Sequence, residues 1–342
     1  MSAREDVELS NQKQKQKQKQ KKYQNPIKNI LEQFPIMILD GAFATELEKC
    51  GCQLDDPLWS AKVLMEDPDQ IAAVHDMYFK AGADCAITAS YQATYEGFMK
   101  RGMSEEGARH LIQKSIFIAR ETRDLFWTEA MQVEGNRPKP LVVASVGPYG
   151  AYLADGSEYS GHYGLSKEAL MTFHKKRLEA LIDAAPDLLG IETIPCLIEA
   201  EAVLELLKSY PEMYAWVSFS AKDGQYINSG ETIEKCAAWA DTLPQIAAIG
   251  INCTDPKYIP ELISRIKAMT DKPVIVYPNT GESYDPIGKS WHGQHHVTTY
   301  SQAAKQWHED GAKLIGGCCR TSPQDIQEIA MWARGHKKSE SK

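Results

Sequence analysis

The chain has 342 residues and a formal net charge of −8 at pH 7. This length suffices for one barrel or two smaller domains, and the negative charge argues against nucleic acid or an anionic membrane as the main partner. No apolar run approaches the roughly 20 residues of a membrane-spanning helix, and the N-terminus lacks the apolar core of a signal peptide. We therefore expect a cytoplasmic protein whose eight cysteines serve metal or thiol chemistry instead of disulfides.

Low-complexity sequence marks the N-terminal segment. Residues 11–22 are a nearly strict alternation of Gln and Lys, which cannot bury apolar surface. We predict that residues 1–25 form a disordered, solvated tail. Residues 26–336 are then one domain, followed by a short C-terminal tail at 337–342.

Eight apolar runs alternate with amphipathic stretches after the tail. The expected strands are Ile36–Leu39, Cys85–Ala89, Leu141–Ser145, Leu188–Ile191, Ala215–Phe219, Ala247–Ile251, Val274–Tyr277 and Lys313–Gly316. The expected helices include Pro68–Ala81, Glu105–Glu129, Lys167–Ala184, Cys196–Ser209, Thr232–Asp241, Tyr258–Met269 and Thr298–Asp310. This alternation predicts an α/β fold, a single-domain (β/α)₈ TIM-type barrel. No Gly-x-Gly-x-x-Gly follows an early strand, which argues against a dinucleotide-binding layout.

Chemically active residues stand at the carboxyl ends of these strands, where barrel active sites lie. Asp40 follows the first strand and Glu192 the fourth. Cys253 follows the sixth strand, and the pair Cys318 and Cys319 follows the eighth. Sixth and eighth strands contribute to the same interior layer of a barrel. The two neighbouring cysteines can reach one point only if the chain already turns out of the strand there, which Gly316-Gly317 makes easy.

Three thiolates at one point are the ligand set of a zinc ion. They leave one position of a tetrahedron open, as a catalytic zinc site requires. The remaining five cysteines lack such partners, and we expect them to be core or surface thiols. A water or a nearby protein oxygen, such as one from Asn252, could fill the open position without substrate.

These motifs together resemble the homocysteine S-methyltransferase family over roughly residues 30–335. The resemblance rests on the two cysteine motifs, on the first-strand motif and on two stretches similar to the branch that uses sulfonium donors. They read Gly250-Ile-Asn-Cys-Thr254, Gly316-Gly-Cys-Cys-Arg-Thr321, Leu39-Asp-Gly-Ala-Phe-Ala-Thr-Glu-Leu47, Ser145-Val-Gly-Pro-Tyr-Gly-Ala-Tyr-Leu-Ala-Asp-Gly-Ser-Glu-Tyr159 and Tyr277-Pro-Asn-Thr-Gly-Glu-Ser-Tyr-Asp285.

The resemblance implies transfer of a methyl group to homocysteine, giving methionine. Matching positions assign Zn²⁺ to the three cysteines, with the homocysteine thiolate at the fourth position. Asp40 and Glu192 are expected to hold the amino group of homocysteine. The backbone at Gly41 and Ala42 is expected to meet its carboxylate.

The donor is expected to be a sulfonium compound, because an anionic zinc–thiolate cluster attracts a cation. We prefer S-methylmethionine and keep S-adenosylmethionine as the second candidate, since nothing resembles a Gly-rich adenosine site. Aromatic faces hold cationic methyl groups, and Trp59, Tyr91 and Tyr149 are the candidates.

Other functions stay open at this point. The same barrel could use betaine or another methyl donor. The three cysteines could instead store or report zinc without catalysis, although a metal store has no need of Asp40 and Glu192. A zinc hydrolase ranks last, because such sites are usually built from His and carboxylate. The sequence leaves the oligomeric state open.

Overall fold

The computed structural model describes residues 24–131, 137–281, 283–285, 290–292 and 299–335. Both predicted tails lie almost wholly outside these residues, so the expected disorder of residues 1–25 and the boundary at residue 336 stay predictions.

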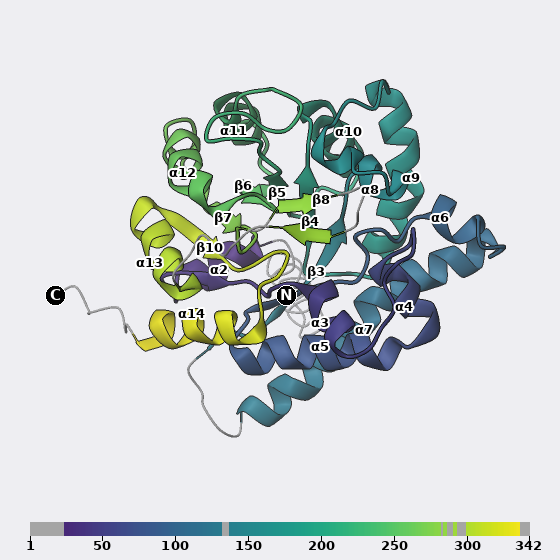
Figure 1. Cartoon of the computed structure of the whole chain (residues 1–342), viewed down its shortest axis with the longest axis horizontal. Coiled ribbons are helices and arrows are strands. Elements are labelled where there is room, and N and C mark those ends of the chain that lie inside the picture. The colour runs from purple at the N-terminus through teal and green to yellow at the C-terminus, as the bar shows by residue number, and fades with distance from the viewer. Residues whose placement is uncertain (1–23, 132–136, 282, 286–289, 293–298, 336–342) are drawn as a thin grey trace, which may run out of the picture.

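Eight parallel strands form a nearly closed ring that helices enclose (Figure 1). The strands are β1 (Met37–Ile38), β2 (Cys85–Ile87), β3 (Leu141–Val146), β4 (Leu188–Ile194), β5 (Ala215–Phe219), β6 (Ile246–Asn252), β7 (Val274–Tyr277) and β10 (Ala312–Ile315). Their spatial order is β1-β10-β7-β6-β5-β4-β3-β2. The predicted (β/α)₈ barrel is confirmed, with all eight strands at the expected places.

Aspartate side chains link β1 to β2, the two strands at the ends of this order. The backbone N–H of Asp84 donates to the Ile38 carbonyl at 2.7 Å, and its carboxylate accepts the Ile38 N–H at 2.8 Å. Farther along, the Asp40 carboxylate accepts the Ile87 N–H at 2.8 Å. Asp40 therefore holds two strands together besides facing the barrel mouth.

The expected helices are all present. They are α5 (Pro68–Ala81), α7 (Glu105–Met131), α9 (Lys167–Asp183), α10 (Leu197–Leu207), α11 (Ile233–Asp241), α12 (Ile259–Lys267) and α13 (Tyr300–Asp310). Side-chain caps explain some of the starts: Ser166 Oγ accepts from Ala169 N, and Thr299 Oγ1 from Gln302 N.

Further elements were not among those predicted from the sequence. They are α2 (Pro26–Leu31), α3 (Phe43–Lys49), α4 (Ser60–Glu66), α6 (Tyr95–Met99), α8 (Tyr149–Leu153), α14 (Pro323–Gly335), the 3₁₀ turns η1 (Ser157–Tyr159) and η2 (Pro256–Tyr258), and the hairpin β8 (Ser283–Asp285) and β9 (Ser290–His292). Most are too short for the apolar period of a helix to be visible.

Apolar side chains fill the barrel interior and close it at the amino ends of the strands. Ile27 and Ile30 of α2 are buried in one cluster with Met37, Cys85 and Leu188, each the first residue of its strand. Helix α2 thus covers the amino ends of the strands and leaves the carboxyl ends for the site. None of the helices in the described ranges has both the length and the apolar character needed to cross a membrane.

Candidate active site at the barrel mouth

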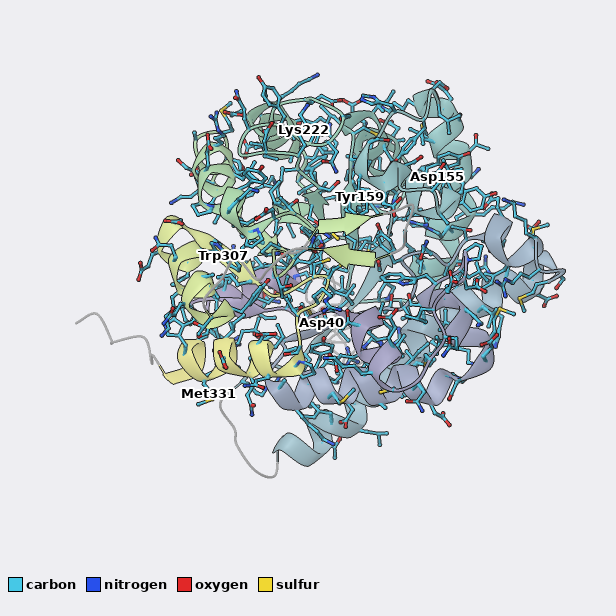
Figure 2. All side chains as sticks on the ribbon, viewed as in Figure 1. Asp40, Asp155, Tyr159, Lys222, Trp307 and Met331 are labelled. Atoms are coloured by element: carbon cyan, nitrogen blue, oxygen red, sulfur yellow. The ribbon has the colours of Figure 1, made fainter. Side chains whose placement is uncertain are left out.

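A cavity of about 700 Å³ opens at the carboxyl ends of the strands. Nearly all residues predicted for the site line it: Asp40, Gly41, Ala42, Trp59, Tyr91, Glu192, Cys253, Cys318 and Cys319. Asp40 and Tyr159, another lining residue, both lie toward the middle of the molecule in Figure 2. Residues separated by almost 280 positions in the sequence therefore share one cavity.

The three cysteines form one cluster. The Sγ atom of Cys319 lies 3.6 Å from that of Cys253 and 4.0 Å from that of Cys318, and all three lie within 4.8 Å of one another. Hydrogen bonds from the Cys318 and Cys319 thiols hold the pKa of Cys253 well below its usual value. The remaining cysteines are also free thiols; Cys50 is exposed, and Cys85, Cys196 and Cys236 are buried.

Backbone geometry at both segments aims these sulfurs inward. Cys253 follows β6 with a left-handed φ of 49° and donates its N–H to the Tyr277 carbonyl at 3.3 Å. Strand β10 ends at Ile315, so the pair Cys318–Cys319 already lies in a loop, as expected. The Cys318 N–H donates to the Pro278 carbonyl at 2.9 Å.

Close approach explains the glycines before the cysteine pair. A Cβ atom at Gly316 would lie 2.4 Å from the Cβ of Leu39, and one at Gly317 would lie 2.2 Å from Thr321 Oγ1. Ordinary Cβ contacts begin near 3.4 Å. Gly316 and Gly317 are therefore needed because β1 and Thr321 pass so near, which adds to the easy turning expected from the sequence.

The sulfur cluster matches the size of a tetrahedral metal site. Metal–sulfur bonds of about 2.3 Å at the tetrahedral angle place two sulfurs about 3.8 Å apart. The separations of Cys319 Sγ from the other two sulfurs, 3.6 and 4.0 Å, bracket that value. The donor set therefore fits a thiophilic metal ion with little rearrangement.

Asn252 ties the ends of three strands together beneath Cys253. Its Oδ1 accepts from Thr193 N and from Ser218 Oγ, both at 2.8 Å, and its Nδ2 donates to Thr193 Oγ1 at 2.7 Å. Thr193 itself has a left-handed φ of 58°. The side-chain oxygen of Asn252 already accepts from two donors, so Asn252 acts as a brace between β4, β5 and β6. A protein oxygen that lies beside the sulfur cluster is the hydroxyl of Tyr159, 3.6 Å from Cys253 Sγ.

Two buried carboxylates face the cavity from β1 and β4. Asp40 is 2% exposed and Glu192 is 6% exposed. Glu192 accepts hydrogen bonds from Tyr277 OH at 3.0 Å and from Ser145 Oγ. Burial raises the pKa of Glu192 to about 7, and burial, followed by the charge of Glu192, raises the pKa of Asp40 well above its usual value. Both carboxylates would be stabilised by a bound cation.

Aromatic residues line one wall of the cavity. Trp59 and Tyr91 meet edge to face with ring centroids 6.2 Å apart, and both belong to the lining. Tyr149 is not among the described lining residues; its ring packs against Tyr152, Tyr163 and Phe173. Its predicted contact with the donor stays a prediction that this geometry does not favour.

Sequence reasoning did not single out Glu158, Tyr159 or Tyr277, although all three line the cavity. Tyr277 donates to Glu192, and Tyr159 lies beside Cys253. Their positions stand within the stretches that carry the resemblance. The chemical role of each depends on a loop or strand position that a residue type alone does not reveal.

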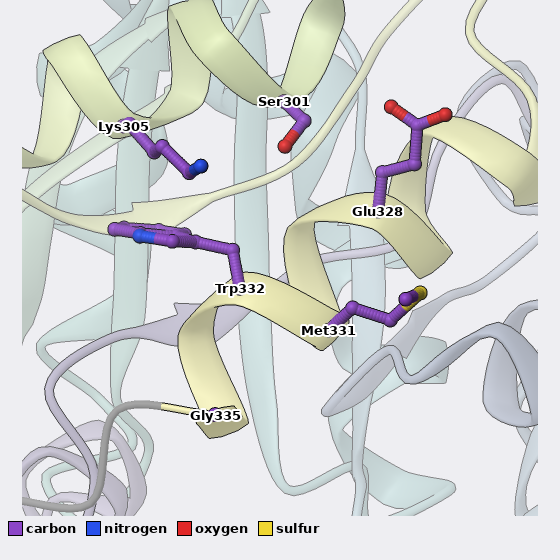
Figure 3. A pocket seen from close by; sticks show the side chains of 6 residues that line it. All are labelled: Ser301, Lys305, Glu328, Met331, Trp332 and Gly335. Atoms are coloured by element: carbon purple, nitrogen blue, oxygen red, sulfur yellow. The ribbon is translucent and has the colours of Figure 1, made fainter.

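A second cavity lies outside the barrel between α13 and α14 (Figure 3). It is lined by Ser301, Lys305, Glu328, Met331, Trp332 and Gly335. These side chains come from two neighbouring helices, and none belongs to the lining of the cavity at the barrel mouth. We assign it no part in the site.

The fold and the site together define a class: a (β/α)₈ barrel with a three-cysteine group suited to a metal ion at the carboxyl ends of its strands. Comparison with known proteins narrows this class. The sequence profile described as Homocysteine S-methyltransferase matches residues 37–333. This chain belongs to the homocysteine S-methyltransferase family, as predicted.

Individual relatives agree. The chain is 58% identical to homocysteine S-methyltransferase YbgG of Bacillus subtilis, over 92% of this chain and 99% of that protein. It is 48% identical to homocysteine S-methyltransferase of Escherichia coli, over 89% and 97% of the two chains. The crystal structure of the metallated form of the Escherichia coli homocysteine methyltransferase MmuM superimposes with a TM-score of 0.80 and 44% identity, covering 90% of this chain and 99% of that one.

We predict that Asn252→Ala lowers the free energy of unfolding by about 2–6 kcal/mol, since two buried donors lose their acceptor at about 1–3 kcal/mol each. Urea unfolding followed by circular dichroism measures the change. Asn228→Ala is the matched control: the side chain of half-buried Asn228 donates one hydrogen bond, to Ser220 Oγ, so we expect a loss below about 1 kcal/mol. Equal stability of Asn252→Ala and the wild type would contradict the bracing role.

Proposed function

We propose that this protein transfers a methyl group from a sulfonium donor to the sulfur of homocysteine, with Zn²⁺ held by Cys253, Cys318 and Cys319. The observation that carries the proposal is the sulfur cluster, whose spacing suits a tetrahedral ion and which opens into a cavity large enough for a substrate. Three protein ligands leave one position for a fourth, which is the arrangement of catalytic zinc. When bound, zinc supplies the positive charge that keeps a substrate thiol deprotonated at neutral pH.

Asp40 and Glu192 are proposed to hold the ammonium group of homocysteine. They are the two deeply buried carboxylates at the strand ends, and a cation between them would relieve the cost of burying their charges. The carboxylate of homocysteine is proposed to meet the backbone at Gly41 and Ala42, where α3 begins. The Ala42 N–H donates to Thr321 Oγ1 at 3.0 Å, which fixes this stretch beside the cysteine loop.

The charge of the cavity supports a cationic methyl donor. Six carboxylate residues are among its described lining, although Arg101 pairs with Asp56, and none of these lining residues is Lys, Arg or His: Asp40, Glu48, Asp55, Asp56, Glu158 and Glu192. A sulfonium group would be attracted by this field. The faces of Trp59 and Tyr91 are proposed to contact its methyl groups, as aromatic rings contact quaternary ammonium.

Charge balance explains why transfer is favourable here. The thiolate donates an electron pair to the methyl carbon while the donor's carbon–sulfur bond breaks and leaves its pair on the donor sulfur. The negative charge of the thiolate and the positive charge of the sulfonium disappear together. The transition state is therefore less charged than the separate reactants and needs less solvation. The residues of the cavity have to align the two sulfurs on either side of the methyl carbon. With S-methylmethionine, both products are methionine.

S-methylmethionine is our preferred donor, with S-adenosylmethionine second. The alternatives are betaine or another methyl donor on the same barrel, and a zinc–thiolate protein without catalysis. The buried carboxylates Asp40 and Glu192 weigh against the last, because metal storage gives no reason to bury two charges beside the metal group.

We extend the proposal to the organisation and surroundings of the chain. One barrel domain spans residues 26–336, between tails at 1–25 and 337–342. The partners are the two small substrates, with neither nucleic acid nor membrane. A cytoplasmic location would keep the three cysteines reduced, as metal binding requires.

Product analysis by mass spectrometry tests the reaction. Zinc-loaded protein under reducing conditions is given deuterium-labelled homocysteine together with unlabelled S-methylmethionine. Unlabelled S-adenosylmethionine and unlabelled betaine replace S-methylmethionine in parallel reactions. We expect labelled and unlabelled methionine in equal amounts from S-methylmethionine, because each substrate becomes one product. Methionine formation with betaine but with neither sulfonium donor would make betaine the donor. The absence of methionine with every donor, despite bound zinc, would overturn the proposal.

The metal assignment predicts that Cys253→Ser and Cys318→Ala each lose zinc and activity, while circular dichroism stays that of a folded barrel. Atomic emission spectrometry of the purified proteins measures the number of zinc ions per chain. Cys50→Ser is the control, because this thiol is exposed and lies outside the cluster. Full zinc content and turnover in Cys318→Ala would show that the ligands are misassigned.

For Asp40→Asn we expect the KM for homocysteine to rise roughly 10- to 100-fold, since one charge-assisted hydrogen bond is lost. The asparagine oxygen can still accept from Ile87 N–H, so the link between β1 and β2 remains. Steady-state kinetics with each substrate varied in turn separates the two KM values. Loss of zinc in this variant would instead place Asp40 beside the metal.

A further inference from the structure

Glu158 lies in the 3₁₀ turn η1, between α8 and α9. Glu158 lines the cavity at the barrel mouth. Its neighbour Tyr159 places a hydroxyl 3.6 Å from Cys253 Sγ, so this turn stands beside the sulfur cluster.

The backbone of the turn is fixed. A Cβ atom at Gly150 would lie 2.3 Å from Glu158 N, so α8 packs directly against the turn. Ser220 Oγ, in the loop after β5, donates to the Glu158 carbonyl at 3.5 Å. The Glu158 side chain therefore starts from a defined point on the cavity wall.

One oxygen of this carboxylate lacks a partner. Glu158 Oε2 is buried and accepts no hydrogen bond from the part of the chain that the structure describes. Burial raises the pKa of Glu158 to about 7, as expected for a carboxylate without a cation beside it. A buried acceptor of this kind is costly unless a ligand satisfies it.

The other buried carboxylates of the cavity already have donors. Asp40 accepts from Ile87 N, and Glu192 accepts from Ser145 and Tyr277. They sit at the ends of β1 and β4, whereas Glu158 enters from a loop. The cavity thus offers two separate anionic places for positive groups.

The proposed reaction brings two positively charged substrate groups to these two places. If Asp40 and Glu192 hold the ammonium of homocysteine, Glu158 remains for the second substrate. A sulfonium centre has no N–H, so it cannot donate a hydrogen bond to Oε2, while an ammonium group carries three donors. An unpartnered oxygen therefore favours an ammonium group over the sulfonium itself.

We infer that Glu158 binds the α-ammonium group of the methyl donor and so makes the enzyme select a sulfonium compound that is also an amino acid. This rests on the proposed function and adds to it the residue that recognises the amino group of the donor. Glu158 is a specificity-determining residue, separate from the residues assigned to zinc and to homocysteine.

The test compares two donors on Glu158→Gln and the wild type, both full-length and zinc-loaded. One donor is S-methylmethionine. The other is (3-carboxypropyl)dimethylsulfonium, which is S-methylmethionine without its amino group. Initial rates give kcat/KM for each, and an inhibition constant against S-methylmethionine measures binding of the second compound if its turnover is slow.

We expect Glu158→Gln to lower kcat/KM for S-methylmethionine roughly 10- to 100-fold, mainly through KM, since a hydrogen bond between charged groups is lost. The kcat/KM for the amino-free compound should change less than about 3-fold, and the KM for homocysteine should stay as in the wild type. Glu212→Gln is the control, because Glu212 is exposed and lies outside the described lining of the cavity; its kinetics should match the wild type.

Two results would overturn the inference. One is an unchanged kcat/KM for S-methylmethionine in Glu158→Gln; the other is an equal loss with both donors, which would assign Glu158 to the sulfonium centre or to the loop. Zinc content and thermal melting of the variant exclude misfolding as the cause of a loss. Failure of the proposed function is distinguishable, because there the wild type itself makes no methionine from S-methylmethionine.

Discussion

Strand β7 is the template on which the sulfur cluster depends. Three successive carbonyls at its carboxyl end each accept an N–H from a neighbouring segment: Val276 from Gly316, Tyr277 from Cys253 and Pro278 from Cys318. The two cysteine segments flank β7 as continuations of β6 and β10. Sulfurs far apart in sequence therefore meet because β7 fixes the position of both cysteine segments along the barrel axis. A shift of either segment's register along β7 would separate the sulfurs.

The remaining parts of the mouth keep this template rigid. The side chain of Asn252 makes its hydrogen bonds to β4 and β5. It bonds to Thr193 and directly precedes Cys253, and both of these residues have a left-handed backbone. Such backbone persists in non-glycine residues only where the surroundings determine it. The glycines at 316 and 317 let the second segment pass against β1. Rigid strand ends hold the sulfurs, while loops supply the cavity walls.

Much of this could be predicted from sequence, and the physical reason is periodicity. Ala215–Phe219 and Val274–Tyr277 end where expected, because buried parallel strands are short apolar runs with clear limits. The cysteines, Asp40 and Glu192 were found from their place at strand ends. The brace role of Asn252 and the position of Glu158 were not, because they depend on three-dimensional contacts of a strand end and a loop that leave no period in the sequence. Tyr149 illustrates the same limit: its motif suggested the cavity, yet its ring packs with Tyr152 and Phe173.

Negative charge at the mouth links the fold to its substrates. Burying Asp40 and Glu192 costs free energy in the empty protein, and their raised pKa values express that cost. A ligand that brings cations recovers it, so the cavity should bind ammonium and sulfonium groups better than neutral analogues. Three thiolates around a divalent ion also carry a net negative charge. In the proposed reaction the attraction between the cavity and the donor is therefore strong before methyl transfer and weaker afterwards, when the sulfonium has become a neutral thioether. The same electrostatics that hold the donor would then help to release the product.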